Sequence, residues 1–510
     1  MSGSPGANKW VVAALISAGI FIALVDTTIV DIVLPKMMAT LEADLYGIQW
    51  VIIAYFMGAA VAMTMVGWLA ETFGHRNTYL LGVVMFVATS ALCGVAPNLE
   101  LMLASRFVQG VAEGMMLPVG ALILIDAFPA EERGLALGIY GLGASFAPAV
   151  GPSLGGFITE HLTWRWVFWV NVPIGLADAL LVFVLLANIR GKQVRKLDWV
   201  GLVLLATSLM SFIVFISKGQ EKGWLGSDFI LNAFLLFVST FVAFVVWEVK
   251  AKDPLLPRNL FTKSDVIVAL VAMAFISMAA YGVFLMLPVY LQRLKGFTTL
   301  QSGLIMLPGS LAAALTTLVA GVLSDKLPAK WVAAVFLVGM FVTTWQFRTG
   351  FFEPRSAAVW DNFWWGMAMG GVFTPIFLIL LGSLPEEEFA DASMITNVVR
   401  LVMGSVGTAY ATNVFTNRSA SFYDALAGRI EAGSAAAAEL MLRLGAGPGP
   451  FVDPVSETKA AASLRTMLQA MASGEAFQAT WRHLALFTLL ALAAVLLARN
   501  VRRSGAAPMH

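Results

Sequence analysis

The apolar run from Trp10 to Leu34 is long enough to cross a bilayer, yet it carries Asp26 and Asp31. A spanning helix needs about 20 mostly apolar residues, and a carboxylate near its middle costs roughly 2.5 to 3.5 kcal/mol on insertion. Such an acid requires a cationic partner or a water-filled cavity, so Asp26 is a candidate proton acceptor. Asp31 lies close to Pro35, where a polar residue tolerated near a helix end is the competing interpretation.

Further apolar runs of similar length fill the chain. Of its 510 residues 59% are hydrophobic and 12% charged, far from the soluble average of about 25% charged. The lengths predict an all-α polytopic membrane protein with fourteen transmembrane helices. The later runs lie at 48–70, 78–96, 101–125, 134–159, 166–187, 198–217, 228–248, 264–288, 300–323, 330–347, 359–382, 390–416 and 483–499.

Composition also excludes several classes of protein. A net charge of +1 argues against a broad basic face for nucleic acid, and no phosphate-binding loop or cluster of metal ligands occurs. The single cysteine, Cys93, lies inside an apolar run, which argues against disulfides and zinc. No nucleophile, base and orienting group fall together. We therefore expect neither an enzyme nor a cofactor.

The distribution of Lys and Arg predicts the orientation. An even number of spans places both termini on one side, and basic residues cluster in the loops of that side, as the positive-inside rule requires of the cytoplasm. Trp164, Trp166 and Trp169 would then form an aromatic belt at the outer interface. The first run is too long for the apolar region of a signal peptide, so we expect it to remain as the first helix. The basic residues are Arg190, Lys192, Arg195, Lys196, Lys250, Lys252, Arg258, Lys263, Arg499, Arg502 and Arg503.

An internal repeat divides the chain. The pattern at Gly67–Glu71 recurs at Gly321–Asp325, and Gly110 and Gly114 match Gly366 and Gly370 at nearly the same offset of about 255 residues. The loop 129–132 recurs likewise at 385–388. We expect an N-terminal six-helix bundle at 1–189, two inserted helices with basic cytoplasmic linkers at 190–263, and a C-terminal six-helix bundle at 264–510. Parallel halves around a midplane site are a transporter architecture.

The C-terminal half contains a long segment, 417–482, that should lie outside the cytoplasm. It is rich in alanine and polar residues, and an interruption at Gly445 to Pro454 separates two stretches that could be helical. A segment of this length is usually either functional or disordered, so docking of an extracytoplasmic partner is one interpretation.

Charged residues in the fourth span share one helix face. Arg106, Gln109 and Glu113 are spaced at i, i+3 and i+7. A buried guanidinium cannot lose its charge, so Arg106 needs a carboxylate, for which Asp26 is the first candidate and Glu113 the second. Alternatively, Arg106 extends to the outer interface. If protonation of Asp26 releases Arg106 and substrate favours the unprotonated pair, proton and substrate compete.

Three further sets of residues are candidates. Glu71, Gly74, Arg76 and Asp126, with Gly67, could latch a cytoplasmic gate, although helix capping explains Gly74 equally well. Asp178 is an intramembrane acid without an evident partner. Aromatic and polar side chains that could line a substrate cavity, or merely face lipid or core, are Tyr55, Tyr281, Phe284, Tyr290, Asn397 and Arg400, together with Met57, Met63, Met278 and Met286. Asn397 and Arg400, at i and i+3, could bond across the halves.

Small residues mark the fifth span. Gly138 is followed by Ala147, Gly151–Pro152 and Gly155–Gly156, and the four-residue spacing lets a neighbouring helix approach closely. Pro152 should bend the helix. By packing physics alone, an ordinary helix contact explains this pattern.

Several motifs resemble those of a known family. GWLAETFGHR, RFVQG and the fifth-span ending GPSLGG resemble signature motifs of the major facilitator superfamily. VDTTIVDIVLP, QWVIIAY and WRWVFWVNVPIG resemble its EmrB/QacA-type drug:proton antiporter branch. FTNRSASFYDALAGRI looks closer to the EmrB side, whose members export through a membrane-fusion adaptor and an outer-membrane channel.

The resemblance assigns roles to residues. It implies that Asp26 is the first-span acid, that Arg106 is the arginine of proton transfer, and that the fifth-span glycines with Pro152 form an antiporter motif that couples rather than merely packs. The sequence departs from the pattern at Glu71, His75, Ala147 and Asp31, and Glu113 is an additional acid, which leaves stoichiometry and substrate charge open.

The expected function is a proton-coupled multidrug efflux antiporter of the bacterial inner membrane. It would export amphipathic hydrophobic compounds by alternating access, with protons as the coupling ion and an adaptor and outer-membrane channel as partners. Two alternatives remain at this point: a proton-coupled transporter of one metabolite, in either direction, or a receptor or scaffold that uses the segment 417–482.

Overall fold

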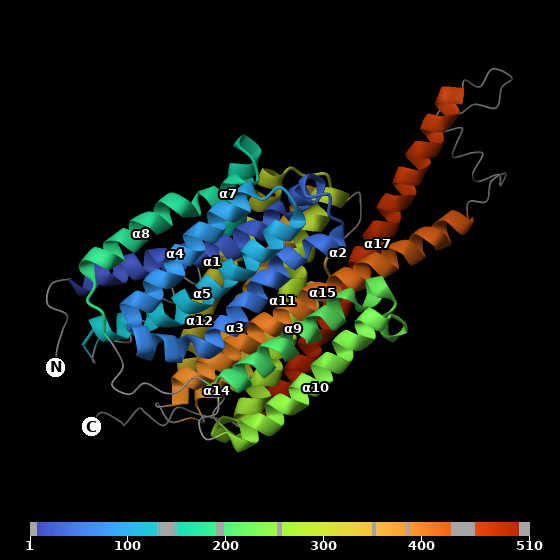
Figure 1. The fold of residues 1–510 in the computed structure, drawn as a ribbon. Helices are drawn as coiled ribbons and strands as arrows, with labels where there is room; N and C mark the ends of the chain where they lie inside the picture. Colours follow the sequence, from blue (N-terminus) through green and yellow to red (C-terminus); the bar gives the residue numbers. More distant parts are fainter. Residues whose placement is uncertain are drawn as a thin grey trace.

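The described helices run side by side and form one elongated bundle (Figure 1). The computed structural model describes residues 8–129, 132, 147, 150–189, 198–251, 255, 258–348, 353–382, 384, 388–429 and 454–498. Within these ranges every regular element is a helix. This agrees with the predicted all-α membrane fold.

The first half contains α1 (Lys9–Thr40), α3 (Trp50–Phe73), α4 (His75–Val95), α5 (Leu99–Ala127) and α8 (Asn171–Leu185) as its long helices. A further helix covers 150–161, and the short α2 (Leu45–Ile48) and α7 (Trp166–Trp169) lie in the connections. Side chains of Asn8 and Asn98 accept backbone N–H groups at the starts of α1 and α5, which explains where these helices begin.

The second half contains α11 (Ser264–Val289), α12 (Thr299–Lys326), α13 (Ala329–Trp345), α14 (Arg355–Leu381), α15 (Phe389–Arg429) and α17 (Pro454–Leu497). A π-helical turn, Tyr290–Leu294, extends α11. Thr298 and Gln301 form a reciprocal capping box at the start of α12.

The number of spans agrees with the sequence prediction. Eleven helices within the described ranges are long and apolar enough to cross a membrane, and α13 is a shorter apolar helix. The predicted fifth and thirteenth spans correspond to the helix at 150–161 and to α15. The first part of the predicted fifth span, residues 134–146 with Gly138, lies outside the described residues. Ala147, which follows, is described.

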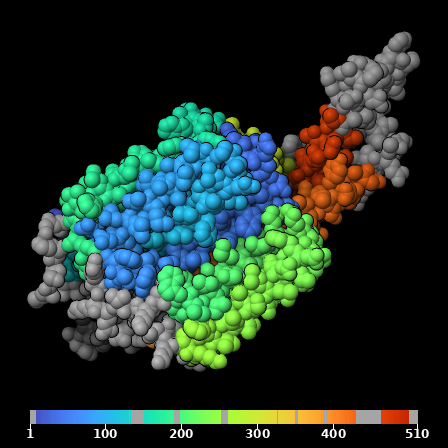
Figure 2. Space-filling view, in the orientation of Figure 1, coloured from blue at the N-terminus to red at the C-terminus, as the bar shows by residue number. Residues whose placement is uncertain are grey.

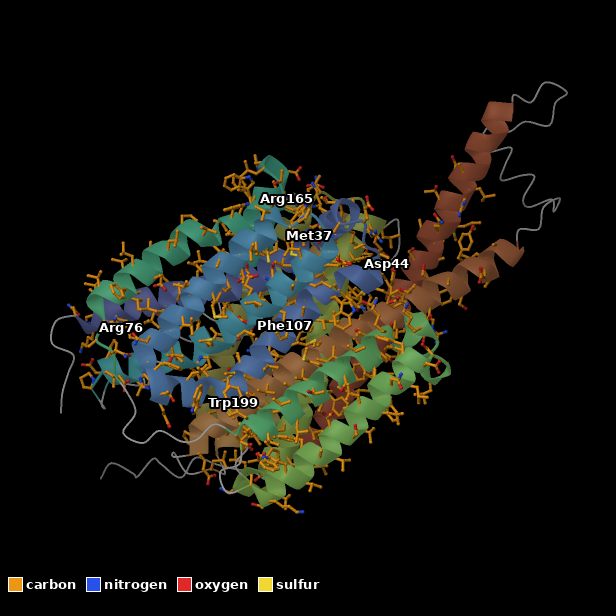
Figure 3. All side chains as sticks on the ribbon, in the orientation of Figure 1. Met37, Asp44, Arg76, Phe107, Arg165 and Trp199 are labelled. Atoms are coloured by element: carbon orange, nitrogen blue, oxygen red, sulfur yellow. The ribbon has the colours of Figure 1, made fainter. Side chains whose placement is uncertain are left out.

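We name the two ends of the bundle after residues that lie there. The Lys9 end holds the start of α1 and the loop between α3 and α4, and the Trp164 end holds the end of α1 and the start of α8. Figure 3 shows Arg76 at the Lys9 end and Arg165 toward the opposite end. Trp166 is exposed, as expected of an aromatic belt, whereas Trp164 is buried and its indole donates a hydrogen bond to Thr40. The belt expectation is therefore wrong for Trp164, because a tertiary contact takes its side chain inward.

The internal repeat appears as two equivalent helix contacts. A Cβ added to Gly110 of α5 would lie 1.9 Å from the Tyr55 carbonyl oxygen of α3, and one on Gly366 of α14 would lie 2.1 Å from the Gly309 carbonyl oxygen of α12. Gly114 and Gly370 repeat this close approach one turn later. The glycines matched in sequence thus perform the same packing role in both halves.

The inserted helices α9 (Trp199–Lys222) and α10 (Asp228–Lys250) form a hairpin on the flank of the bundle, drawn in green in Figure 2. α9 contacts α3 of the first half and α15 of the second half. Its attachment includes the bond from Asn413 Nδ2 to the Ile216 carbonyl oxygen (3.2 Å) and the bond from Gln220 Nε2 to Asn417 Oδ1 (3.1 Å). The hairpin therefore lies at the seam between the halves.

Helices α15 and α17 project beyond the rest of the bundle at the Trp164 end (Figures 1 and 2). They supply the two helical stretches predicted within 417–482, and residues 430–453 between them lie outside the described part of the chain. α17 is longer than the predicted span 483–499, because it begins at Pro454. Phe477 and Trp481, although within the segment 417–482, are buried in the bundle core.

Candidate functional site

Asp26 lies inside the first half, in the middle of α1, with none of its surface exposed. Arg106 Nη1 of α5 donates to Asp26 Oδ2 at 2.6 Å, and Asn171 Nδ2 of α8 donates to Asp26 Oδ1 at 2.6 Å. Both carboxylate oxygens are therefore bonded, and the acid joins three helices. The predicted pairing of Arg106 with Asp26 is confirmed.

Arg106 is held on several sides. Its Nε donates to the Val51 carbonyl oxygen at 3.2 Å, and its Nη1 also donates to Gln109 Oε1 at 2.8 Å. The guanidinium carbon lies 4.0 Å from the centre of the Tyr55 ring, within range of a cation–π interaction. Arg106 is 1% exposed, so it does not extend to the membrane interface.

A second polar contact fixes Asn171. Its Nδ2 also donates to Ser90 Oγ of α4 at 3.0 Å, and Ser90 Oγ donates to the Phe168 carbonyl oxygen at 2.9 Å. Ser90 of α4, itself bonded to α7, thus fixes which way the side-chain amide of Asn171 points. Sequence reasoning did not assign Asn171 this role, although an amide just inside an apolar run was the available signal.

Glu113 and Asp31 are also buried, at 4% and 8% exposure. Thr27 Oγ1 of α1 donates to Glu113 Oε1 at 3.3 Å and lies 3.4 Å from the Tyr55 hydroxyl. Glu113 therefore belongs to a Thr27–Tyr55 cluster next to Asp26 rather than forming the ion pair of Arg106, which goes to Asp26. Asp31 is nine residues before the end of α1, so it does not lie at a solvated helix end.

Aromatic side chains connect the halves near this cluster. Phe56 of α3 lies 4.8 Å from Tyr281 of α11 between ring centroids, and Tyr281 lies 5.8 Å from Phe284, which in turn contacts Trp365 of α14 at 5.5 Å. Tyr281 and Phe284 of the predicted cavity are therefore neighbours, and Tyr55 is connected to them through the ring of Phe56. Met57, Met63, Met278 and Met286 are buried.

The other predicted cavity residues have different surroundings. Tyr290 packs on Phe477 at 5.3 Å, and its hydroxyl donates to the Arg348 carbonyl oxygen at the Trp164 end. Asn397 Nδ2 donates to the Ser393 carbonyl oxygen within α15, so the expectation that this amide bonds across the halves is wrong. Arg400 Nε is buried and has no hydrogen-bond partner in the described ranges.

The fifth-span motif contacts both halves. A Cβ on Gly151 would lie 2.0 Å from Thr28 Oγ1 of α1, and one on Gly156 would lie 2.8 Å from the Thr299 carbonyl oxygen of α12. Gly155 faces Ile29 and Ile32 of α1, and the Pro152 carbonyl oxygen lies against Gly303 of α12. Close approach on two faces requires glycine at these positions.

The residues of the predicted gating loop contact other parts of the first half. Gly74 ends α3 with φ +90°, so it is a helix cap, and Arg76 Nη1 donates to the Leu186 carbonyl oxygen at 3.0 Å. Asp126 pairs with His75 Nδ1 at 2.7 Å. Glu71 is partly buried near the end of α3, and Gly67 has no atom within 4 Å of an added Cβ.

Hydrogen bonds between the halves lie toward the Trp164 end. Gln292 Nε2 donates to the Ile32 carbonyl oxygen at 2.7 Å, and Ser153 Oγ donates to the Gly303 carbonyl oxygen at 3.3 Å. At the Lys9 end, the pairs Lys9–Glu132 and His75–Asp126 belong to the first half, and Lys263–Glu388 links the start of α11 to that of α15.

Comparisons with known proteins agree with this architecture. Residues 16–408 match the family model of the Major Facilitator Superfamily. The chain is 31% identical over 82% of its length to the uncharacterized MFS-type transporter YhcA of Bacillus subtilis, covering 79% of that protein. It is 29% identical to the multidrug export protein EmrB of Escherichia coli, over 81% of each chain.

Among solved structures, the chain resembles a bacterial homologue of the human lysosomal transporter Spinster in an inward-facing conformation. The TM-score is 0.67 at 14% identity, with 98% of this chain and 100% of that chain covered. At this identity the likeness concerns the fold alone. The family is shown by the family model, which covers most of the chain. The protein belongs to the Major Facilitator Superfamily and is a multi-pass membrane transporter.

Proposed function

We propose that the chain is a proton-coupled antiporter that exports amphipathic hydrophobic compounds across the bacterial inner membrane by alternating access. The observation that carries this proposal is the buried Asp26 carboxylate, bonded through both oxygens to α5 and α8. An intramembrane acid with an arginine partner is characteristic of proton-driven transporters. The likeness to a multidrug export protein supports the direction and the substrate class.

Protonation of Asp26 would remove the counterion of Arg106 at a place where both side chains are buried. Arg106 would keep its bonds to Val51 and Gln109, but a buried guanidinium without a carboxylate is strongly unfavourable. The three helices held together by the charged pair would then rearrange. One proton thus converts a local charge change into movement of α1 against α5 and α8.

Substrate would bind where the halves face one another, beside Glu113, Tyr55 and Tyr281. Glu113 provides a second buried carboxyl, and the Phe56–Tyr281–Phe284 aromatics provide an apolar surface. A substrate that favours the unprotonated Asp26–Arg106 pair competes with the proton, and this competition produces exchange. Each charge that crosses 100 mV contributes about 2.3 kcal/mol of drive.

The positive-inside assignment makes the Lys9 end cytoplasmic. The bonds Gln292–Ile32 and Ser153–Gly303 then close the halves on the outer side. The fifth-span glycines would maintain this seal, since they allow the helix at 150–161 to contact α1 and α12 together. The projecting helices α15 and α17 would reach outward, where a membrane-fusion adaptor that leads to an outer-membrane channel would bind.

Proton release from detergent-purified protein tests the proposal. A panel of cationic and anionic amphipathic compounds is added in weak buffer, and binding is measured separately by calorimetry for wild type, Asp26→Asn and Asp26→Glu. Release on binding by wild type and Asp26→Glu, with none from Asp26→Asn, is expected. Release that persists in Asp26→Asn assigns the proton to another acid. Binding without release by wild type contradicts proton coupling by direct competition.

A further inference from the structure

Asp178 of α8 is a second carboxyl inside the first half that the Asp26 site does not use. It is 4% exposed, and the Tyr79 hydroxyl of α4 donates to its Oδ2 at 3.1 Å. Its Oδ1 is buried and has no hydrogen-bond partner among the described residues. A carboxyl group in this position has an open site for a proton, and the part of the chain that the structure describes pairs it with no cation.

The Tyr79–Asp178 pair touches the helix that carries Asp26. A Cβ added to Gly19 of α1 would lie 2.1 Å from the Tyr79 hydroxyl oxygen and 2.6 Å from Asp178 Oδ2. Gly19 therefore allows the backbone of α1 to lie directly on the pair. Any shift of α1 relative to α4 and α8 changes this contact first.

The two carboxyl groups lie at successive levels of one interface. Gly19 and Asp26 are seven residues apart on α1, and Asp178 and Asn171 are seven residues apart on α8, which corresponds to about 10 Å along each axis. These helices contact each other, and α4 contacts α8 beside them (Figure 1). The Tyr79–Asp178 level is therefore two helix turns nearer the Lys9 end than the Asp26 level.

A small cavity of about 30 Å³ continues the same interface to the Lys9 end. Val12 of α1, Leu186 directly after α8 and the His75–Asp126 pair line it, with Arg76 beside them. Val12 precedes Gly19 by seven residues, and His75 precedes Tyr79 by one turn of α4. The interface of α1, α4 and α8 thus carries Asp26, then Asp178, and then, at the Lys9 end, a mostly apolar cavity that contains the polar groups of His75, Arg76 and Asp126.

The groups that face Asp178 come from each neighbouring helix. α4 provides Tyr79, α1 provides the backbone at Gly19, and α8 itself carries Asn171 two turns away, at the level of Asp26 and Arg106. Val83 and Val87 of α4 and Val182 of α8 are buried on either side of the pair. Val83 and Val87 follow Tyr79 by four and eight residues, and Val182 follows Asp178 by four, which places all three on the helix faces that carry the pair.

We propose that Asp178 is a second proton-binding site, through which protons pass between Asp26 and the cytoplasm along the α1–α4–α8 interface, separately from the substrate path between the halves. The proposal rests on proton coupling at Asp26. The proton on the Asp26 carboxyl moves to the Asp178 carboxylate, which restores the Asp26–Arg106 pair. Asp178 then gives that proton to water in the cavity beside His75, and no other atom changes its bonds. The side chains of Val83, Val87 and Val182 move aside for each transfer when α1 shifts.

A purely structural role for the pair makes a different prediction. An asparagine at 178 can accept the same hydrogen bond from Tyr79 but cannot carry a proton. Asp178→Asn therefore keeps the contact between α4 and α8 and removes only the proposed chemistry. Tyr79→Phe removes the hydrogen bond and keeps the carboxyl group.

The test uses proteoliposomes with a trapped pH indicator. Proton-driven drug transport and drug–drug exchange, which requires no net proton movement, are measured on wild type, Asp178→Asn, Tyr79→Phe and a control, Asp228→Asn, at the start of the inserted helix α10. Asp178→Asn should lower proton-driven transport about 100-fold, as expected for loss of a proton-transfer group, and leave drug–drug exchange unchanged. Asp228→Asn should resemble wild type.

Three results would overturn the proposal. The first is proton-driven transport by Asp178→Asn at the wild-type rate. The second is an equal loss of both activities in Asp178→Asn, which identifies a structural defect. The third is a loss of proton-driven transport in Tyr79→Phe but not in Asp178→Asn. These results differ from failure of the proposed function, in which wild type itself couples no proton movement to transport.

Discussion

Arg106 Nη1 lies 2.6 Å from Asp26 Oδ2 at a place where neither side chain has more than 1% of its surface exposed. Charged groups in such a setting depend on each other, because water cannot replace a lost partner. Asn171 occupies the other carboxylate oxygen, so α1, α5 and α8 meet at one acid. A change in charge there affects the packing of half the N-terminal bundle.

Arg106→Lys should abolish coupled transport although it keeps the positive charge. Lysine has no counterpart of the Arg106 Nε bond to Val51, and its ammonium lacks the planar group that stacks on Tyr55. We expect a loss of about 100-fold in proton-driven export, similar to the loss of a proton-transfer group. Transport assays in proteoliposomes would measure this loss. Export by Arg106→Lys at the wild-type rate would show that charge alone suffices.

Asn171→Ala should destabilise the fold. It leaves Asp26 Oδ1 buried without its donor, and an unsatisfied buried polar group costs about 1 to 3 kcal/mol, or more when it is charged. Thermal unfolding in detergent at neutral pH would measure the loss. Asn232→Ala on the exposed side of α10 is the matched control and should unfold at the wild-type temperature. Equal unfolding temperatures for both variants would show that Asp26 does not need Asn171.

The sequence allowed the Asp26–Arg106 pair to be predicted, because a buried arginine must find a carboxylate and few were available. It did not identify Asn171 or Tyr79 as partners of acids. Both lie on other helices, and which amide or phenol faces an acid depends on helix rotation and crossing, which the spacing of apolar residues leaves undetermined. The same reason explains why Trp164 is buried while Trp166 is exposed, and why Tyr290 packs on α17.

The attachment of the inserted hairpin was also beyond sequence reasoning. The sequence predicted two spans but assigned neither helix a side that meets protein, although the buried side of α9 carries Ser208, Ser211 and Ser217. In the structure, Ile213 of α9 packs with Ile53, Met57 and Ala409. The repeat at an offset of about 255 residues led to the prediction of two six-helix halves, and the matched glycines Gly110 and Gly366 make equivalent close contacts in the structure, since close helix approach requires small residues.

Gly110→Ala and Gly67→Ala should have opposite effects on stability. A Cβ at Gly110 would lie 1.9 Å from a backbone carbonyl oxygen that cannot move aside, so we expect a loss of about 1 to 3 kcal/mol. At Gly67 nothing lies within 4 Å, and replacing a helical glycine by alanine should stabilise by about 0.5 to 1 kcal/mol. Thermal unfolding in detergent distinguishes the two. Similar effects from both substitutions would contradict the close approach of α3 and α5.

Ile213→Ala tests whether the inserted hairpin is an integral part of the bundle. Ile213 is 1% exposed and packs where α9 meets α3 and α15, so removing its side chain should leave a cavity and lower the free energy of unfolding by about 2 to 5 kcal/mol. Phe241→Ala on α10 is the control. Its ring is 46% exposed, so its loss should change stability by less than about 0.5 kcal/mol.

Transport rates of these two variants extend the test. Because α9 contacts both halves, movement of α3 relative to α15 during the transport cycle must be accommodated at Ile213. Ile213→Ala should therefore change the rate of drug–drug exchange as well as stability, whereas Phe241→Ala should change neither. A hairpin that only faces lipid would give the same result for both variants, and such a result would mean that the two halves move past each other without the inserted helices.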